Sequence, residues 1–279
     1  TEKVWEAAAE LELPRLVVVN RIDRERASLE RTLQSLRDSC SRAVVPLQLP
    51  IGEEKAFKGV VDLIARRAFV YAGNEKADFK EQDVPADMAA AVEHARESLI
   101  EMVAESDEKL MEHFFEIGTL SDDELLAGLK AATAAGKLFP VVCTSAILNI
   151  GVPQLLDAIV LTLPSPAERP FRFVGPDGVV ASRPANEAAP LSAFVWKTIA
   201  DPFAGRITMF RVVSGTLKSD SSVHNRSRDV AERVGSLQLL QGKTPAAVPE
   251  IKAGDIGTVA KLKDTLTNDT LGDKSDSAV

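Results

Sequence analysis

Two short polar segments contain the residue types in this chain that can do chemistry. Residues 20–23 read Asn-Arg-Ile-Asp and follow the apolar run 16–19, whereas residues 144–146 read Thr-Ser-Ala and follow the run 140–143. The carboxylate of Asp23 can accept hydrogen bonds from the ring N–H and the exocyclic amino group of guanine. Adenine offers no such pair of donors on that edge. The two segments therefore suit a site for a guanine base.

A guanine site of this kind gives each segment a role. The bonds to Asp23 reject bases that lack the two donors, because the buried acceptor would stay unpaired. We expect Asn20 to tie the two loops together and to approach the base. In the small-residue turn of Ser145 and Ala146, a backbone N–H near Ala146 would bond the guanine carbonyl. A larger side chain at Ala146 would block that approach.

An alternative interpretation makes the first segment a simple turn. Asn and Asp after a strand often bond their own backbone, so residues 20–23 alone do not distinguish the two readings. Two matched loops after two strands favour the binding site, because ligands of open α/β sheets bind at the carboxyl ends of strands.

Hydrophobic periodicity predicts the elements that position these loops. The expected helices are 1–11, 27–39, 85–105, 107–116, 121–135 and 152–161, and the expected strands are 15–20, 44–47, 58–63, 68–71 and 139–143. Ser121 and Glu124 have the spacing of a capping box. The strands before the two loops should be neighbours in one sheet. The segment between them is too long for a loop, so we expect an inserted subdomain at about 48–137.

The pattern changes at residues 163–166 (Leu-Pro-Ser-Pro), because proline disfavours helix at and before its own position. Beyond this linker, short runs at 191–199, 206–214, 221–224, 230–240 and 257–261 predict an all-β barrel. Phe194, Trp196 and Phe210 are interpreted as barrel core, since no aromatic series with intervening basic residues indicates a base-stacking platform. We expect the polar tail 273–279 to be disordered.

Several further segments make the chain resemble bacterial elongation factor G, a translational GTPase. In the order of that family they are residues 14–24, 46–52, 57–63, 151–158, 163–166, 200–206 and 253–257. The resemblance implies a partial α/β P-loop GTPase-type domain at 1–165 with an incomplete, mostly parallel sheet. It also implies an inserted α+β subdomain at about 48–137 and a β-barrel of the translation-factor domain II type at 166–279.

The resemblance further implies a function and a site. The activity of the whole protein would be GTP hydrolysis coupled to ribosomal translocation of tRNA and mRNA. The guanine end of GTP or GDP would be held by Asn20, Arg21, Asp23, Ser145 and Ala146. Arg21 stands where the family usually has Lys, and Thr144 stands where Gly is common. An arginine can still lay its stem and planar guanidinium along the base, so guanine binding should survive.

The phosphate-binding motifs of a GTPase are absent from this sequence. It contains no Gly-x-x-x-x-Gly-Lys-[Ser/Thr] loop, and its one Asp-x-x-Gly lies at 269–272, close to the end. We therefore interpret the chain as an excised piece whose parent holds the phosphates and Mg²⁺ with residues outside it. On this interpretation the chain alone neither hydrolyses GTP nor holds its phosphates well.

Charge is divided unevenly along the chain. Residues 1–165 carry a net charge of −10 and residues 166–279 one of +2, which together give the −8 of the whole chain. The chain lacks the overall basic footprint of a free-standing nucleic-acid binder. Between 193 and 234, however, seven Lys and Arg face four acids, and such a run is either a solvated face or a surface for RNA phosphates.

The expected partners are guanine nucleotide and the ribosome. The resemblance implies contacts with ribosomal RNA and ribosomal proteins through the β-barrel and the inserted subdomain, whose acidic helices are otherwise a solvated face. No apolar stretch of about 18 residues occurs, so no membrane span is expected. Two cysteines are too few for a disulfide framework. We expect a cytoplasmic protein.

Two other functions remain open at this stage. A ribosome-protection or release-factor GTPase would share these segments. A non-enzymatic ribosome-binding module would keep the shape without binding nucleotide.

Overall fold

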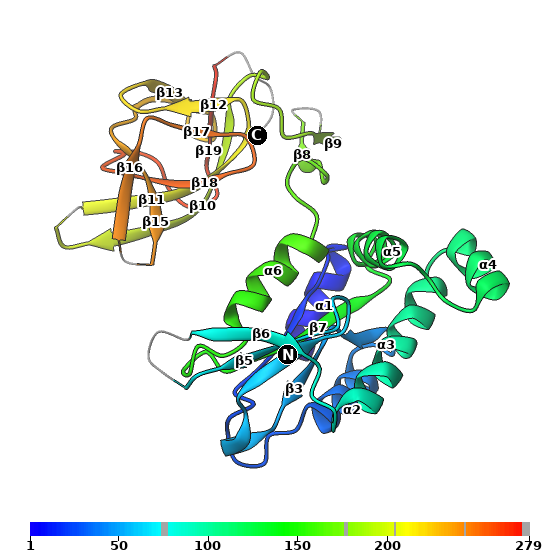
Figure 1. The fold of residues 1–279 in the computed structure, drawn as a ribbon. Helices are drawn as coiled ribbons and strands as arrows, with labels where there is room; N and C mark the ends of the chain where they lie inside the picture. The colour runs from blue at the N-terminus through cyan, green and yellow to red at the C-terminus, as the bar shows by residue number, and fades with distance from the viewer. Residues whose placement is uncertain (74–77, 176–177, 204, 243, 275–279) are drawn as a thin grey trace. The chain divides into compact units, whose positions relative to one another are not determined.

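The chain folds into two compact units, Thr1–Pro164 and Ser165–Val279 (Figure 1). The computed structural model describes residues 1–73, 78–175, 178–203, 205–242 and 244–274. Most of the tail predicted to be disordered, residues 275–279, lies outside the described residues. Asp273, at its start, is ordered by two bonds to Leu191, one from its N–H to the Leu191 carbonyl and one from the Leu191 N–H to its carboxylate.

The first unit is built on a three-stranded parallel sheet. Strand β7 (Phe139–Thr144) lies between β1 (Val17–Asn20) and β2 (Val44–Pro46). All six residues of β7 are buried, because helices cover both faces of the sheet.

Alternate side chains of β7 enter two different clusters. Val141 and Cys143 pack in a cluster with residues of α1 (Glu2–Glu10) and α2 (Leu29–Ser39). Val142 packs in a second cluster that includes residues of α6 (Val152–Thr162). The sheet is therefore anchored from both sides, which fixes the point where β7 ends and its loop begins.

The segment between β2 and β7 forms a second sheet and three helices. Strands β3 (Gln48–Ile51), β4 (Gly59–Asp62), β5 (Arg67–Tyr71) and β6 (Phe79–Asp83) pair in that order, all antiparallel. The short 3₁₀ helix η1 (Glu54–Ala56) lies in the β3–β4 turn, and α3 (Ala89–Ala104), α4 (Glu108–Ile117) and α5 (Asp122–Ala134) follow.

Two polar arrangements fix the helices of this segment. The capping box predicted from Ser121 and Glu124 is confirmed at the start of α5. Arg96 on α3 is buried, donates to the carbonyls of Leu63 and Ile64 at 2.6 and 2.9 Å, and pairs with Asp122. The Arg96 guanidinium thus joins α3 to the loop after β4 and to α5. These bonds offset the cost of removing its charge from water.

The second unit is antiparallel β structure around one apolar core, so the predicted all-β class is confirmed. Its main sheet has the order β14-β13-β19-β10-β11-β18-β15-β16, and two smaller sheets pair β12 with β17 and β8 with β9. The bounds are β8 Phe171–Val174, β9 Val180–Arg183, β10 Ser192–Asp201, β11 Gly205–Ser214, β12 Thr216–Lys218, β13 Ser222–Asn225, β14 Val230–Arg233, β15 Leu237–Gln241, β16 Thr244–Val248, β17 Glu250–Lys252, β18 Ile256–Ala260 and β19 Thr270–Gly272.

The structure corrects the aromatic residues assigned to this core. Phe210 is fully buried as predicted, but Phe194 and Trp196 are 41% and 43% exposed. The sequence shows an apolar run at this point. It does not show which residues of the run face the core and which face solvent. Both exposed rings lie on β10, where Ala193 and Val195 before and between them are the buried residues.

Candidate functional site

The ends of β1 and β7 bring the two predicted loops to the same edge of the sheet. The strands run parallel, and their register pairs Asn20 with Thr144. Each loop begins directly after these paired residues. The Ile22 N–H donates to the Thr144 carbonyl at 3.3 Å, so the two loops are also hydrogen-bonded to each other.

The side chain of Asn20 connects the loops through a single oxygen. Its Oδ1 accepts from the N–H of Arg21 at 2.8 Å, from the N–H of Ala146 at 3.0 Å and from the Thr144 hydroxyl at 3.2 Å. Two of these donors lie at the end of β7 and in the loop that follows it. The amide Nδ2 remains on the other side of the planar group, where it can donate to a base.

One detail differs from the sequence expectation. The N–H of Ala146, expected to bond the guanine carbonyl, already donates to Asn20. The next N–H, that of Ile147, has no hydrogen bond to another described residue. A guanine carbonyl at this place would therefore either share the Ala146 N–H with Asn20 or accept from the Ile147 N–H. The sequence motif gives no signal for Ile147, because the contact involves only its backbone.

Asp23 carries a carboxylate without a hydrogen-bonding partner among the described residues. Its side chain is only 12% exposed, and Oδ1 is buried and accepts no hydrogen bond from them. Oδ2 lies 3.7 Å from Nε of Arg24, which is too long for a hydrogen bond. Leaving such an acceptor unpaired costs about 1–3 kcal/mol. Two N–H donors of a guanine edge would satisfy the carboxylate, so the acceptor that this structure offers fits that base.

The turn that begins the inserted segment supports the first loop. The Glu54 N–H donates to the carbonyl of Ile22 at 2.8 Å, and the Glu54 carboxylate accepts from the N–H of Arg26 at 2.9 Å. Glu53 accepts from the N–H of Leu29 at 2.7 Å, at the first residue of α2. Asp23 lies between the residues that this turn holds. Sequence reasoning missed Glu53 and Glu54, which follow directly after the segment 46–52 that carries part of the family resemblance.

The second loop is closed tightly between β7 and α6. Ser145 is fully buried, and its backbone pairs with that of Ile150 through bonds of 2.9 and 3.0 Å. Gly151 adopts a φ of +76°, and a Cβ there would lie 2.4 Å from the carbonyl oxygen of Cys143. Only glycine fits this return of the chain. Ala146 and Ile147, at the tip, are exposed.

Arg21 and Cys143 complete the surroundings of the loops. Arg21 is exposed and adopts a φ of +68°, in the left-handed region. Its role along the face of the base stays a prediction.

Burial raises the pKa of the Cys143 thiol to about 12, so this group is a neutral core side chain and not a nucleophile.

The described parts of the chain show neither a metal cluster nor a membrane-spanning helix. Within those ranges, no three His, Cys, Asp or Glu side chains come together in a way that could hold a metal ion. None of the helices there combines the length and apolar character needed to cross a bilayer. The Asp-x-x-Gly sequence at 269–272 has a structural role, because Asp269 accepts bonds from Asn225 and Arg228 at 2.9 and 2.7 Å.

Comparison with known proteins agrees with this geometry. Residues 1–165 match the family model of the elongation factor Tu GTP binding domain, and residues 190–274 match that of elongation factor G domain 2. A crystal structure of the protein ttk003000868 from Thermus thermophilus is similar over 99% of this chain, with 29% sequence identity and a TM-score of 0.80. The chain spans 38% of the length of that structure. The chain therefore belongs to the translational GTPase family, with a GTP-binding domain of the elongation factor Tu type followed by an antiparallel β domain.

Proposed function

We propose that the whole protein is an elongation factor of the G type that couples GTP hydrolysis to ribosomal translocation of tRNA and mRNA. Within it, this chain supplies the guanine-recognition loops. The observation that carries the proposal is the unpartnered, buried Oδ1 of Asp23 beside the Asn20 side chain that joins the two loops. A merely structural turn would use that oxygen in a bond to its own backbone.

The proposed recognition assigns one task to each residue. Asp23 accepts the ring N–H and the exocyclic amino group of guanine. Asn20 fixes the spacing of the loops and donates to the base from Nδ2. The stem of Arg21 covers one face of the base, while Ser145 and Ala146 hold the second loop at the distance that a carbonyl contact requires. These groups bind and orient the nucleotide and do not react with it.

In this proposal, phosphate binding, Mg²⁺ binding and GTP hydrolysis are carried out by residues outside this sequence. It contains no phosphate-loop motif, so the phosphates and the Mg²⁺ ion would be held by other parts of the whole protein. When bound, Mg²⁺ would neutralise charge on the phosphates. The chain by itself is then expected to be inactive as a GTPase, and any binding of nucleotide would come from the base alone.

The domain boundaries and ribosome contacts are part of the same proposal. Residues 1–165 would be the latter part of a GTPase domain with its insertion at about 48–137, and 166–279 a domain of the domain II type. The division into compact units at Pro164 and Ser165 supports this boundary. The ribosome would meet the insertion through its acidic helices and the β domain through its basic strands, in the cytoplasm.

A base-analogue series tests guanine recognition in the whole protein. Affinities are measured by isothermal titration for GDP, for IDP, which lacks the exocyclic amino group, and for ADP, which lacks both donors. Because one bond to a carboxylate is lost, IDP should bind about 10- to 100-fold more weakly than GDP, and ADP more weakly still. Equal affinity for the three nucleotides would contradict the role given to Asp23.

A further inference from the structure

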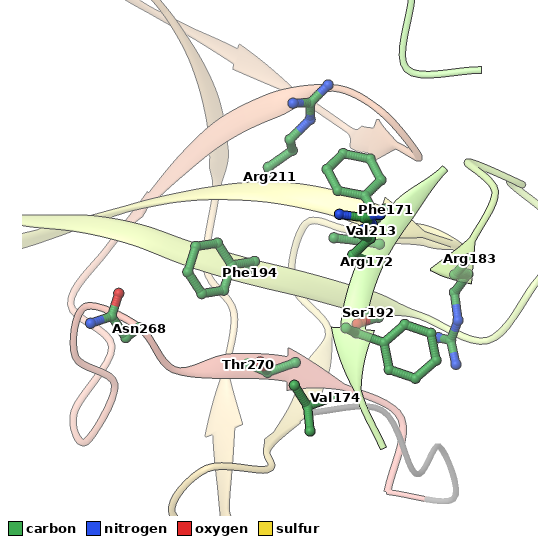
Figure 2. A pocket seen from close by; sticks show the side chains of 11 residues that line it. Phe171, Arg172, Val174, Arg183, Ser192, Phe194, Arg211, Val213, Asn268 and Thr270 are labelled. Carbon is green, nitrogen blue, oxygen red and sulfur yellow. The ribbon is translucent and has the colours of Figure 1, made fainter. Parts of the chain in front are cut away.

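The second unit contains a groove that the proposed nucleotide site does not use. It lies between strand β8 of the β8–β9 hairpin and the face formed by β10, β11 and β19, and its volume is 490 Å³ (Figure 2). This volume is in the range of about 300–1,000 Å³ that is common for small-ligand sites. Three phenylalanines and three arginines line it, and none of its described lining residues is acidic.

The floor of the groove is a row of three cross-strand neighbours. The register places Phe194 on β10 opposite Arg211 on β11 and, on its other side, opposite Thr270 on β19. Directly opposite residues of antiparallel strands have side chains on the same face, about 5 Å apart. An exposed aromatic ring, with 41% of its surface open, therefore has a cation on one side and a hydroxyl group on the other.

The β8–β9 hairpin forms the wall of the groove. Contacts between arginines and aromatic rings hold this wall in place. The guanidinium of Arg211 lies 4.6 Å from the ring centroid of Phe171. Nε of Arg211 donates to the Gly254 carbonyl at 3.3 Å. Arg183 lies 5.2 Å from the ring centroid of Phe173 and donates to Ser214 at 3.1 Å. The wall is thus fixed to the β domain by side chains that remain positively charged.

These groups define the chemistry of the occupant. An open aromatic face takes a flat ring, and neighbouring guanidinium groups take an anion. Nucleotides of single-stranded RNA combine the two. Both edges of β10 along this row are already paired, with β11 and β19, so the floor offers side chains instead of free backbone donors. That disfavours an extended peptide, which binds by adding a strand to a free edge.

We propose that this groove binds an unpaired nucleotide of RNA, with its base against Phe194 and its phosphate beside Arg211 and Arg172. The inference rests on the proposed function only in assigning the RNA to the ribosome. Asn268 also lines the groove, and its side-chain amide can donate to and accept from a base edge.

The test is the binding of a short fluorescein-labelled oligoadenylate to the chain, followed by fluorescence anisotropy. Phe194→Leu should weaken binding about tenfold, because the stacking face is lost while an apolar side chain remains. Trp196→Leu is the matched control: Trp196 lies on the same strand, is 43% exposed and does not line the groove. Its affinity should equal that of the wild type.

A second pair of variants tests the charge. Arg172→Gln should weaken binding and reduce its dependence on salt, because a phosphate contact is removed. Lys218→Gln removes an exposed cation outside the groove and should leave the affinity unchanged. Equal effects in both members of either pair would overturn the proposal, as would absence of binding by the wild type or full competition by a polyglutamate peptide.

Ribosome cosedimentation of the whole protein separates this inference from the proposed function. If the whole protein binds ribosomes but its chain fails to bind oligoadenylate in the groove, the groove inference is wrong and the proposed function stands. If the wild-type whole protein does not bind ribosomes, the proposed function itself is wrong.

Discussion

Asn20 is the residue on which the geometry of the candidate site depends most. Three donors converge on its Oδ1, and two of them, at the end of β7 and in the loop after it, lie more than a hundred residues further along the chain. A side chain that merely capped a turn would accept only from its own neighbours. The long-range bonds hold the two loops, which follow separate strands, at a fixed spacing.

Replacing this residue separates the oxygen from the amide nitrogen. Asn20→Ala removes the acceptor, so we expect the free energy of unfolding of the first unit to fall by about 1–2 kcal/mol, measured by urea denaturation. Asn20→Asp keeps an acceptor oxygen and should restore most of this stability, but it lacks the Nδ2 donor and should still bind GDP weakly. Gln34→Ala, on the exposed face of α2, is the control. Equal stability of the alanine variant and the wild type would contradict the connection between the loops.

At the scale of elements, the β3–β4 turn is a support for the loop that carries Asp23. The turn is tight: Gly52 has a φ of +74°, and a Cβ there would lie 2.2 Å from the Ala56 carbonyl oxygen. From this turn, Glu54 holds Ile22 and Arg26 on either side of Asp23. The start of the inserted segment is therefore coupled to the position of the carboxylate.

This coupling predicts an effect on nucleotide release. Glu54→Ala removes the bond to the Arg26 N–H, so the loop should open more often and GDP should dissociate about fivefold faster from the whole protein, as expected for a lost bond of about 1 kcal/mol. Lys55→Ala, the neighbouring exposed residue, should leave the dissociation rate unchanged. The readout is stopped-flow displacement of a fluorescent GDP. A slower or unaltered rate in Glu54→Ala would remove the turn from the site.

The elements also differ in how far the sequence could predict them. Strands β1 and β7 are apolar runs with polar loops after them, and both were predicted together with the loop residues. Strand β6 was missed because all five of its residues are exposed and show no apolar alternation. The expected run 230–240 is two strands, β14 and β15, with residues 234–236 between them.

The contacts within the site were less accessible than its residues. In the bonds from Ala146 to Asn20 and from Arg26 to Glu54, the donor is a backbone N–H, which residue type does not reveal. The exposure of Phe194 depends on which face of β10 turns inward, and an apolar run does not specify that face. Sequence patterns identified the loops, whereas their hydrogen bonds required the fold.

At the scale of the whole molecule, each compact unit has its own apolar core and should respond separately to perturbation. In the second unit, Glu232 is buried at 4% exposure and connects β14 to the loop before β19. Burial alone would raise the pKa of its carboxyl. Bonds from the N–H groups of Asp264, Lys263 and Thr265 and from the Thr265 hydroxyl outweigh burial, so the pKa lies below its ordinary value of 4.5.

A depressed pKa makes the second unit sensitive to acid. The stabilisation by the Glu232 carboxylate is fully present above about pH 4.5 and is lost as the pH falls through the lower pKa of the folded state. Glu232→Gln should therefore be less stable than the wild type at neutral pH, and the difference should shrink in acid. Thermal unfolding followed at several pH values measures this. At each pH, the unfolding transition of the first unit should be the same in Glu232→Gln and in the wild type. A difference that is independent of pH would exclude this role of the charge.

The specificity change in Asp23→Asn tests the central claim most directly. In the whole protein, the amide of this variant should repel the donors of guanine and donate to the extra carbonyl of xanthine. We expect the affinity for GDP, measured by isothermal titration, to fall by about 100-fold and that for XDP to rise by a similar factor. Asp38→Asn, on the exposed side of α2, should change neither affinity. Unaltered affinities for GDP and XDP in Asp23→Asn would contradict the assignment of this carboxylate to the guanine base.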